Sequence, residues 1–183
     1  GMAAVGRGSG YNADGSYDYG RLMDHPEEGT DVGFHDTFDR MLRGINRFEY
    51  AEYVYPVSTE KVEQLLAWCS GHQIKVVLIV PPYAPSVWER MEQTGKYGYF
   101  AWIIKILNEL CEPYGYEVYD FSYMPETADA EYIDGYHGGD RVYARLTLEL
   151  AQQSETLAGL IDTDYLTAAL QPGDNPLRLT PVA

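Results

Sequence analysis

The chain has 183 residues, of which 45% are apolar, so a single domain with a hydrophobic core is expected. Its 28 acidic residues outnumber its 13 basic residues, and the formal net charge of −15 disfavours nucleic acid and anionic membranes as partners. The sequence contains no apolar run long enough to span a bilayer and no signal-peptide pattern, so its compartment stays open.

The first third of the chain is expected to contain helices after an irregular start. Residues 1–33 are rich in Gly, Asp and Tyr without apolar periodicity, which predicts an irregular surface segment. Apolar residues at helical spacing predict a first helix over 34–47. A short extended piece over 50–56 and a second helix over 58–71 follow. The predicted apolar stripe of this second helix consists of Val62, Leu65, Leu66 and Cys69.

Two apolar runs predict the strands of a parallel sheet. The β-branched run over 74–80 indicates a strand covered on both faces, and it ends at Pro81-Pro82-Tyr83, which cannot continue a ladder. A second buried strand is expected over 116–121, and helices are expected over 85–91 and 98–111. Cys69 and Cys111 lie in amphipathic helices, where free Cys acts as a small hydrophobic residue; a disulfide between them stays open.

The last third is expected to hold a polar loop over 122–136, a helix over 139–153 and a weakly ordered tail. We therefore divide the chain into an irregular segment (1–33), one α/β domain (34–171) and an extended tail (172–183). Alternation of helices and strands predicts a doubly wound, three-layer α/β/α fold around a mainly parallel sheet. Ligands in such folds bind beyond the carboxyl ends of the strands, where both special loops are expected.

The most informative motif is Asp134-Gly135-Tyr136-His137, which follows the second predicted strand. A carboxylate that accepts a hydrogen bond from one ring nitrogen of His137 leaves the other nitrogen free to take a proton from a hydroxyl. Asp134 and His137 are therefore the candidate catalytic residues. The alternatives are a turn acid and a packed ring, or a metal site formed with Asp140, although Asp140 suits the start of a helix.

Other residues are weaker candidates. Pro82, Tyr83 and Tyr136 are expected to line a pocket, as aromatic walls or hydroxyl donors, or simply to pack as half-buried side chains. His35-Asp36 with Asp39 is reminiscent of a metal-dependent phosphohydrolase pair, but a second ligand cluster is not evident. We expect no metal, and an exposed helix start is the simpler interpretation of His35.

A strand, a polar loop, Asp-x-x-His and a closing helix, over roughly residues 57–153, resemble the C-terminal part of SGNH (GDSL-type) hydrolases. The resemblance is closest to relatives in cell-envelope acyl transfer, including DltD-like proteins. It implies that His137 is the general base, that Asp134 orients it, and that the substrate is a small or carbohydrate ester. It implies no cofactor, and relatives of this kind are often found in the cell envelope.

The family's nucleophilic Ser, in a Gly-Asp-Ser context after the first strand, has no counterpart here. The resemblance therefore implies that the N-terminal nucleophile segment is missing and that this chain alone is inactive as an esterase. Ser16, after Asp14-Gly15, is a weak substitute because no strand positions it. The alternative function is a non-catalytic binding or assembly module with a tyrosine-rich cleft. Loss of early strands would leave a sheet edge open, which predicts a homodimer through that edge.

Overall fold

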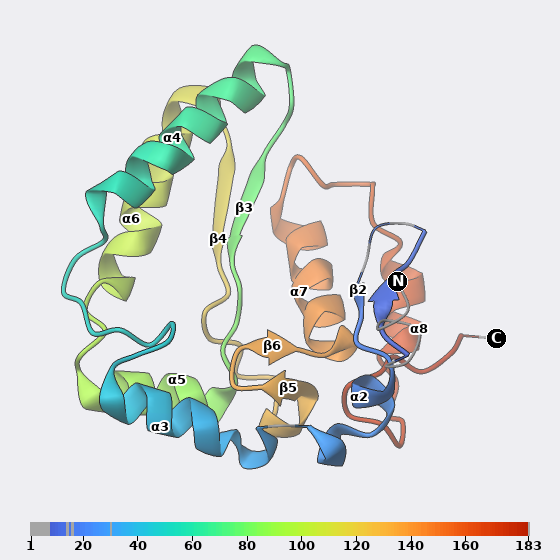
Figure 1. The fold of residues 1–183 in the computed structure, drawn as a ribbon. Helices are drawn as coiled ribbons and strands as arrows, with labels where there is room; N and C mark the ends of the chain where they lie inside the picture. The colour runs from blue at the N-terminus through green and yellow to red at the C-terminus, as the bar shows by residue number, and fades with distance from the viewer. Residues whose placement is uncertain (1–7, 14, 16, 30, 183) are drawn as a thin grey trace.

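The computed structural model describes residues 8–182 except 14, 16 and 30, and shows a mixed α/β fold (Figure 1). Its N-terminal segment is not simply irregular, because it contains a small hairpin and short helices. These elements are β1 (Gly10–Tyr11), β2 (Tyr17–Asp18), α2 (Arg21–Asp24), η1 (Pro26–Glu28) and η2 (Val32–Phe34).

The remaining elements include the helices and strands expected from the sequence and several short additional ones. The helices are α3 (His35–Arg43), α4 (Pro56–Gly71), α5 (Pro85–Thr94), α6 (Phe100–Cys111), α7 (Asp140–Gln153) and α8 (Thr163–Ala169), with short 3-10 turns η3 (Glu112–Tyr114) and η4 (Asp129–Glu131). The strands are β3 (Val77–Val80), β4 (Glu117–Asp120), β5 (Tyr132–Asp134) and β6 (His137–Gly138). In the described part of the chain, no helix combines the length and apolar character needed to cross a membrane.

The parallel pairing of β3 and β4 confirms the predicted parallel sheet in its central feature. Their register runs from Val77 opposite Glu117 to Val80 opposite Asp120, and α5 and α6 form the crossover between them. Helix α6 packs on β4 and α4 packs on α6, whereas α7 lies on the other side of the pair in Figure 1.

The prediction that both strands are fully covered was wrong. No residue of β3 or β4 is fully buried, and Ile79 is 38% exposed. Within the described residues, no further strand pairs with either one, so the sheet has only two strands. A β-branched sequence therefore forms a strand here without the neighbours that would bury it.

Two helix boundaries differ from the sequence expectation for local reasons. Helix α3 is shorter than predicted because Gly44 adopts the left-handed conformation (φ 65°) and ends it. Helix α4 begins at Pro56, whose fixed φ suits a first helical position, so the expected extended piece is not a strand. Leu66 and Cys69 are buried as expected, but Leu65 is 58% exposed and lies off the apolar stripe.

The core lies between α3, α5, α7 and the carboxyl end of the β3–β4 pair. Its buried members are Phe34, Met41, Phe48, Ala84, Val87, Met91, Tyr97, Phe121, Met124, Tyr132, Val142, Leu146 and Leu150. Cys69 and Cys111 are free and buried, which confirms their role as small hydrophobic residues.

The expectation of a weakly ordered tail was also wrong. Leu177 is fully buried, and the Asn175 side chain donates a hydrogen bond to the Met23 carbonyl oxygen (2.8 Å). Arg178 lies 3.0 Å from the Asp24 carboxylate. The Asn175 and Arg178 contacts hold the tail against the N-terminal segment, and Leu177 packs at the start of α7; the sequence of the tail alone contains no signal for these contacts.

Glu117 joins β4 to the end of α7. Its carboxylate accepts hydrogen bonds from the Ser154 hydroxyl, the Tyr119 hydroxyl (3.0 Å), and the backbone N–H (2.8 Å) and hydroxyl (2.7 Å) of Thr156. Burial opposes ionisation, but these donors outweigh it and lower the pKa of Glu117 to about 2.

Replacing Glu117 with Gln should therefore lower the free energy of unfolding by about 2 kcal/mol at pH 7. Because the pKa of the folded form lies below the ordinary value of 4.5, this stabilisation is complete above pH 4.5 and is lost as the pH falls toward 2. Urea unfolding should give a smaller difference in the free energy of unfolding between the wild-type chain and Glu117→Gln at pH 3 than at pH 7. Glu109→Gln, at an exposed pair with Lys105, is the control; an equal difference at both pH values would contradict the expectation.

Candidate functional site

Asp134 and His137 lie in a β-hairpin, so the prediction of a continuous polar loop over 122–136 was wrong. Asp134 ends β5, His137 begins β6, and the two residues are paired across the hairpin. The Asp134 Oδ1 atom accepts the backbone N–H groups of Tyr136 (3.0 Å) and His137 (2.8 Å). A carboxylate that closes a turn in this way holds its own side chain and the following histidine in one arrangement.

The second carboxylate oxygen of Asp134 faces the imidazole ring. Its Oδ2 atom lies 2.8 Å from His137 Nδ1, and the two side chains are 22% and 38% exposed. Burial would raise the pKa of Asp134, but the hydrogen bonds from the His137 ring and the two backbone N–H groups lower it overall. Asp134 is thus an ionised acceptor that favours a proton on Nδ1 and leaves Nε2 as the basic nitrogen.

The turn is fixed from behind by the loop that follows β3. The carbonyl oxygen of Gly135 accepts the backbone N–H of Ala84 (3.0 Å), directly after Pro81-Pro82-Tyr83. A Cβ atom on Gly135 would lie 2.7 Å from Thr37 Cγ2 and 2.8 Å from Val87 Cγ2, so only glycine fits without a shift of α3 or α5. The two loops that the sequence placed at one end of the sheet are therefore in direct contact.

An aromatic layer connects the expected pocket residues to the His137 ring. The Tyr136 ring centroid lies 4.4 Å from the His137 ring, Phe48 lies 5.9 Å from Tyr136, and Tyr83 lies 6.4 Å from Phe48. Burial raises the pKa of Tyr83 to about 12, so its hydroxyl stays protonated, and Pro82 is fully buried. These residues pack as a wall beneath the site, and none of the three lines any of the five best-formed cavities in the described part of the chain.

Three residues near the site were missed by sequence reasoning. The guanidinium groups of Arg40 and Arg47 lie 5.6 and 5.8 Å from the Tyr136 ring centroid, and the Tyr19 ring lies 6.2 Å from the His137 ring. Tyr19 belongs to the segment that was expected to be irregular. Contacts between residues this distant in sequence leave no local pattern from which they could have been inferred.

Among the described residues, the structure places no nucleophile at His137. Across the residues it describes, no serine, threonine or tyrosine hydroxyl forms a hydrogen bond with the His137 ring. The Ser122 hydroxyl instead donates to Asp120 (2.5 Å), and the backbone N–H of Ser86 donates to the Asp129 carboxylate (3.0 Å). Ser16 lies outside the described residues.

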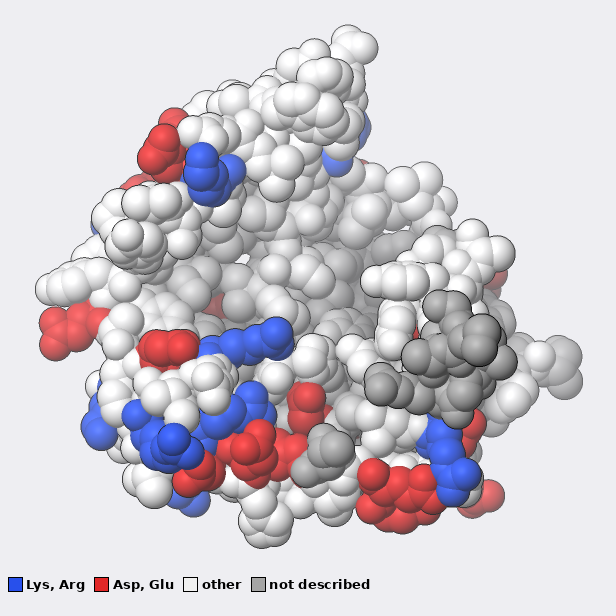
Figure 2. Space-filling view, in the orientation of Figure 1, with Lys and Arg blue, Asp and Glu red and all other residues white. Residues whose placement is uncertain are grey.

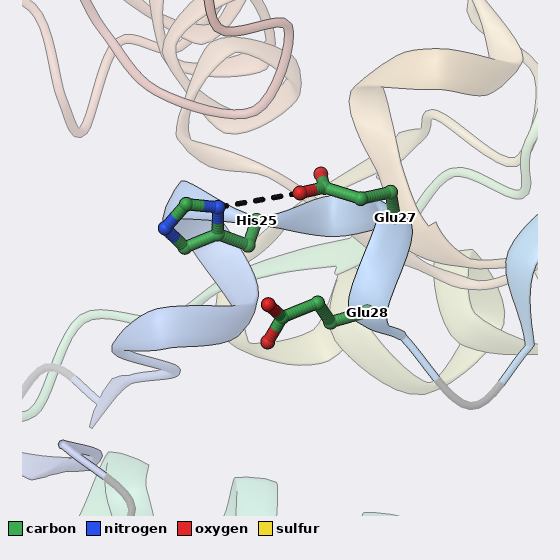
Figure 3. A group of neighbouring side chains, drawn as sticks. All are labelled: His25, Glu27 and Glu28. Carbon is green, nitrogen blue, oxygen red and sulfur yellow. Dashed lines mark hydrogen bonds and ion pairs between the residues drawn. The ribbon is translucent and has the colours of Figure 1, made fainter.

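Metal-ligating side chains converge at only one place in the described structure, and it is not the site at His137. His25, Glu27 and Glu28 come together on the surface near α2 (Figure 3). His25 Nδ1 lies 3.2 Å from Glu27, whereas Glu28 binds Arg21 through two hydrogen bonds of 2.6 Å. All three are exposed, and an exposed set of ion pairs explains them.

The metal alternatives weighed from the sequence do not form clusters. Asp140 does not converge with Asp134 and His137 but lies 3.8 Å from Arg178. Asp36 and Asp39, which are both exposed, instead form ion pairs of 3.0 Å with Arg40 and Arg43, one turn further along the helix. A salt-bridged helix is the better description of α3.

Comparison of the chain with family models, with curated proteins and with solved structures found no match. The chemistry of the site is therefore argued from its geometry. That geometry is an imidazole oriented by an ionised carboxylate and supported by an aromatic layer, and its second ring nitrogen has no hydrogen-bond partner among the described residues.

Asp134→Asn should move the proton of neutral His137 from Nδ1 to Nε2. The Asn oxygen would keep the two backbone N–H groups, so its NH₂ group would face Nδ1, which must then accept. Long-range ¹H–¹⁵N correlation spectra at alkaline pH measure the tautomer, and the Nε2–H form should become dominant. His72, whose Nδ1 lies 2.8 Å from the Trp68 carbonyl oxygen, is the internal control. Retention of the Nδ1–H form in the variant would contradict the assigned arrangement.

Proposed function

We propose that this chain carries the general-base part of an SGNH-like ester hydrolase or O-acyltransferase centre that acts on a small or carbohydrate ester. The observation that carries the proposal is the 2.8 Å contact between Asp134 Oδ2 and His137 Nδ1, which leaves the other ring nitrogen without a partner among the described residues. That nitrogen is available to take the proton of an attacking hydroxyl, while Asp134 stabilises the imidazolium that forms.

The remaining parts of the centre come from the family resemblance. In this proposal the β3–β4 pair belongs to a larger three-layer, doubly wound sheet, and a serine at the end of a missing strand supplies the nucleophile. The exposed faces of β3 and β4 support this, because a β-branched strand such as Val77–Val80 normally lies between neighbours. A base without its nucleophile has little to activate, so the chain alone should be nearly inactive.

The test compares two proteins in an assay with a short-chain aryl ester. Residues 1–183 should hydrolyse the ester at the same low rate with and without His137→Ala. A protein that includes the in-frame upstream coding sequence, if that sequence encodes a strand followed by Gly-Asp-Ser, should be active. His137→Ala should reduce its kcat by about 10³-fold or more.

The control is His72→Ala, at an exposed histidine that stacks on Trp68. An active extended protein that is indifferent to His137→Ala would refute the proposed role. A clear rate from residues 1–183, lost on His137→Ala, would instead show that the nucleophile lies within this chain. Ser16→Ala would then be the next variant.

A second candidate is a non-catalytic assembly module, and the open sheet favours it. Figure 2 shows that the face in view is hollowed near its centre, where few charged side chains lie. Among the described residues neither β3 nor β4 has another strand as neighbour, and unpaired edges recruit strands from other chains. We propose that two copies of the chain pair through the open edge of β3 and form a symmetric homodimer.

Light scattering coupled to size-exclusion chromatography tests this second candidate. The expected mass is twice the 20.7 kDa of one chain, and Ile79→Pro, which removes a backbone N–H that points away from β4, should shift the protein toward the monomer. A monomer at every concentration would refute the dimer without bearing on the esterase proposal.

A further inference from the structure

A cavity of about 470 Å³ lies where the end of α5, the start of α6 and the end of β4 meet. Aromatic and acidic side chains line it: Trp88, Tyr97 and Phe100 supply the rings, and Glu92 and Asp120 supply the carboxylates. Neither Asp134 nor His137 contributes to it. Its size falls within the range of cavities that hold small molecules, and its position beyond the carboxyl end of a parallel strand is where ligands of α/β sheets bind.

Two of the aromatic rings that line the cavity are nearly perpendicular to each other. The Trp88 and Phe100 rings meet at 88°, with their centroids 5.4 Å apart. Tyr97 adds a third ring, which is itself buried, and burial raises its pKa to about 12, so it stays neutral. Rings arranged at right angles present both faces and edges to a ligand, and the electron-rich faces attract positive charge.

Among the described residues, the two carboxylates have no cationic partner, because neither Glu92 nor Asp120 forms an ion pair with Lys or Arg. Asp120 Oδ1 accepts the backbone N–H (3.0 Å) and the hydroxyl (2.5 Å) of Ser122, which holds this carboxylate at the cavity. Its other oxygen remains available to a ligand.

We propose that this cavity binds a small organic cation, a quaternary ammonium or a protonated amine with an apolar body. The rings bury the apolar part and attract the charge through their faces, and the two carboxylates neutralise it. The net charge of −15 raises the local concentration of cations. An anionic ligand would face two carboxylates, and a neutral one would desolvate them without compensation.

Choline and its uncharged isostere 3,3-dimethylbutan-1-ol test the proposal by isothermal titration calorimetry at constant ionic strength. Choline should bind at least about tenfold more tightly than the alcohol. Asp120→Asn, which keeps the acceptor for Ser122, and Glu92→Gln on the exposed surface of α5 should each weaken choline binding by about fivefold or more. Glu109→Gln, at an exposed ion pair elsewhere on α6, should leave it unchanged.

Equal binding of choline and the alcohol would overturn the proposal, as would tighter binding of a neutral monosaccharide, which would make the cavity a sugar site. No saturable binding up to about 50 mM of choline, tetramethylammonium or butylammonium would also overturn it. Circular dichroism of each variant establishes that it is folded. The outcome is independent of esterase activity, because the cavity shares no residue with the Asp134–His137 pair.

Discussion

Replacing Phe48 with Ala is expected to lower the free energy of unfolding by about 3–5 kcal/mol, the largest effect of any substitution considered for this chain. The Phe48 side chain is 1% exposed and packs against the rings of Tyr83 and Tyr136. Asn46 and Arg47 before it have left-handed backbones, with φ values of 53° and 78°. These two strained backbone conformations persist only if the free energy gained by burying the Phe48 ring offsets their cost.

Urea unfolding monitored by circular dichroism measures this loss, and Leu42→Ala is the matched control. Leu42 lies on α3 and is 78% exposed, so its truncation should change the free energy of unfolding by less than about 0.5 kcal/mol. A loss below about 1 kcal/mol for Phe48→Ala would mean that the surrounding rings move into the space left by the removed side chain. Phe48 would then not be the centre of this part of the core.

Replacing Glu131 with Gln is expected to cost about 3 kcal/mol. Glu131 is 7% exposed, and its carboxylate lies 2.7 Å from Arg145 and 3.5 Å from Arg141, which are themselves largely buried. Loss of its charge would leave two guanidinium groups poorly compensated in a low-dielectric environment. Because Glu131 directly precedes β5, the same change should disturb the hairpin that carries Asp134 and His137.

Thermal and urea unfolding of Glu131→Gln measure the cost, and Asp39→Asn is the control. Asp39 forms an ion pair of 3.0 Å with Arg43 on the exposed face of α3, where such pairs contribute less than about 1 kcal/mol. If both variants lost the same small amount, Glu131 would be no more important than a surface acid. A further check is the His137 tautomer, which should become heterogeneous only in Glu131→Gln.

Local patterns predicted the helices and the parallel strands well. Helix α5 begins at Pro85, and α6 ends shortly before Pro113, as these prolines predict. Helix α7 lies almost where its apolar spacing predicts. The predictions failed where tertiary neighbours decide. Val77–Val80 has the composition of a fully buried strand, yet its exposure depends on strands that no local window contains.

The site was predicted in part, for the same reason. Asp134 and His137 are three residues apart, and their contact follows from turn geometry that a sequence can display. The hairpin around them went unpredicted because β6 contains only His137 and Gly138, too few residues for an alternating pattern. Tyr19 and Arg47 approach from distant segments, and pairing over such separations is not encoded locally.

The contacts between the tail and the N-terminal segment bear on the order in which the molecule folds. The Arg178–Asp24 bond joins residues 154 positions apart, so it closes nearly the whole chain into one loop. Closing so long a loop costs much chain entropy and gains little until the interior is in place. The two ends should therefore come together last during folding and separate first during unfolding. Hydrogen exchange at Leu177 should then be faster than at Val142, although both are completely buried.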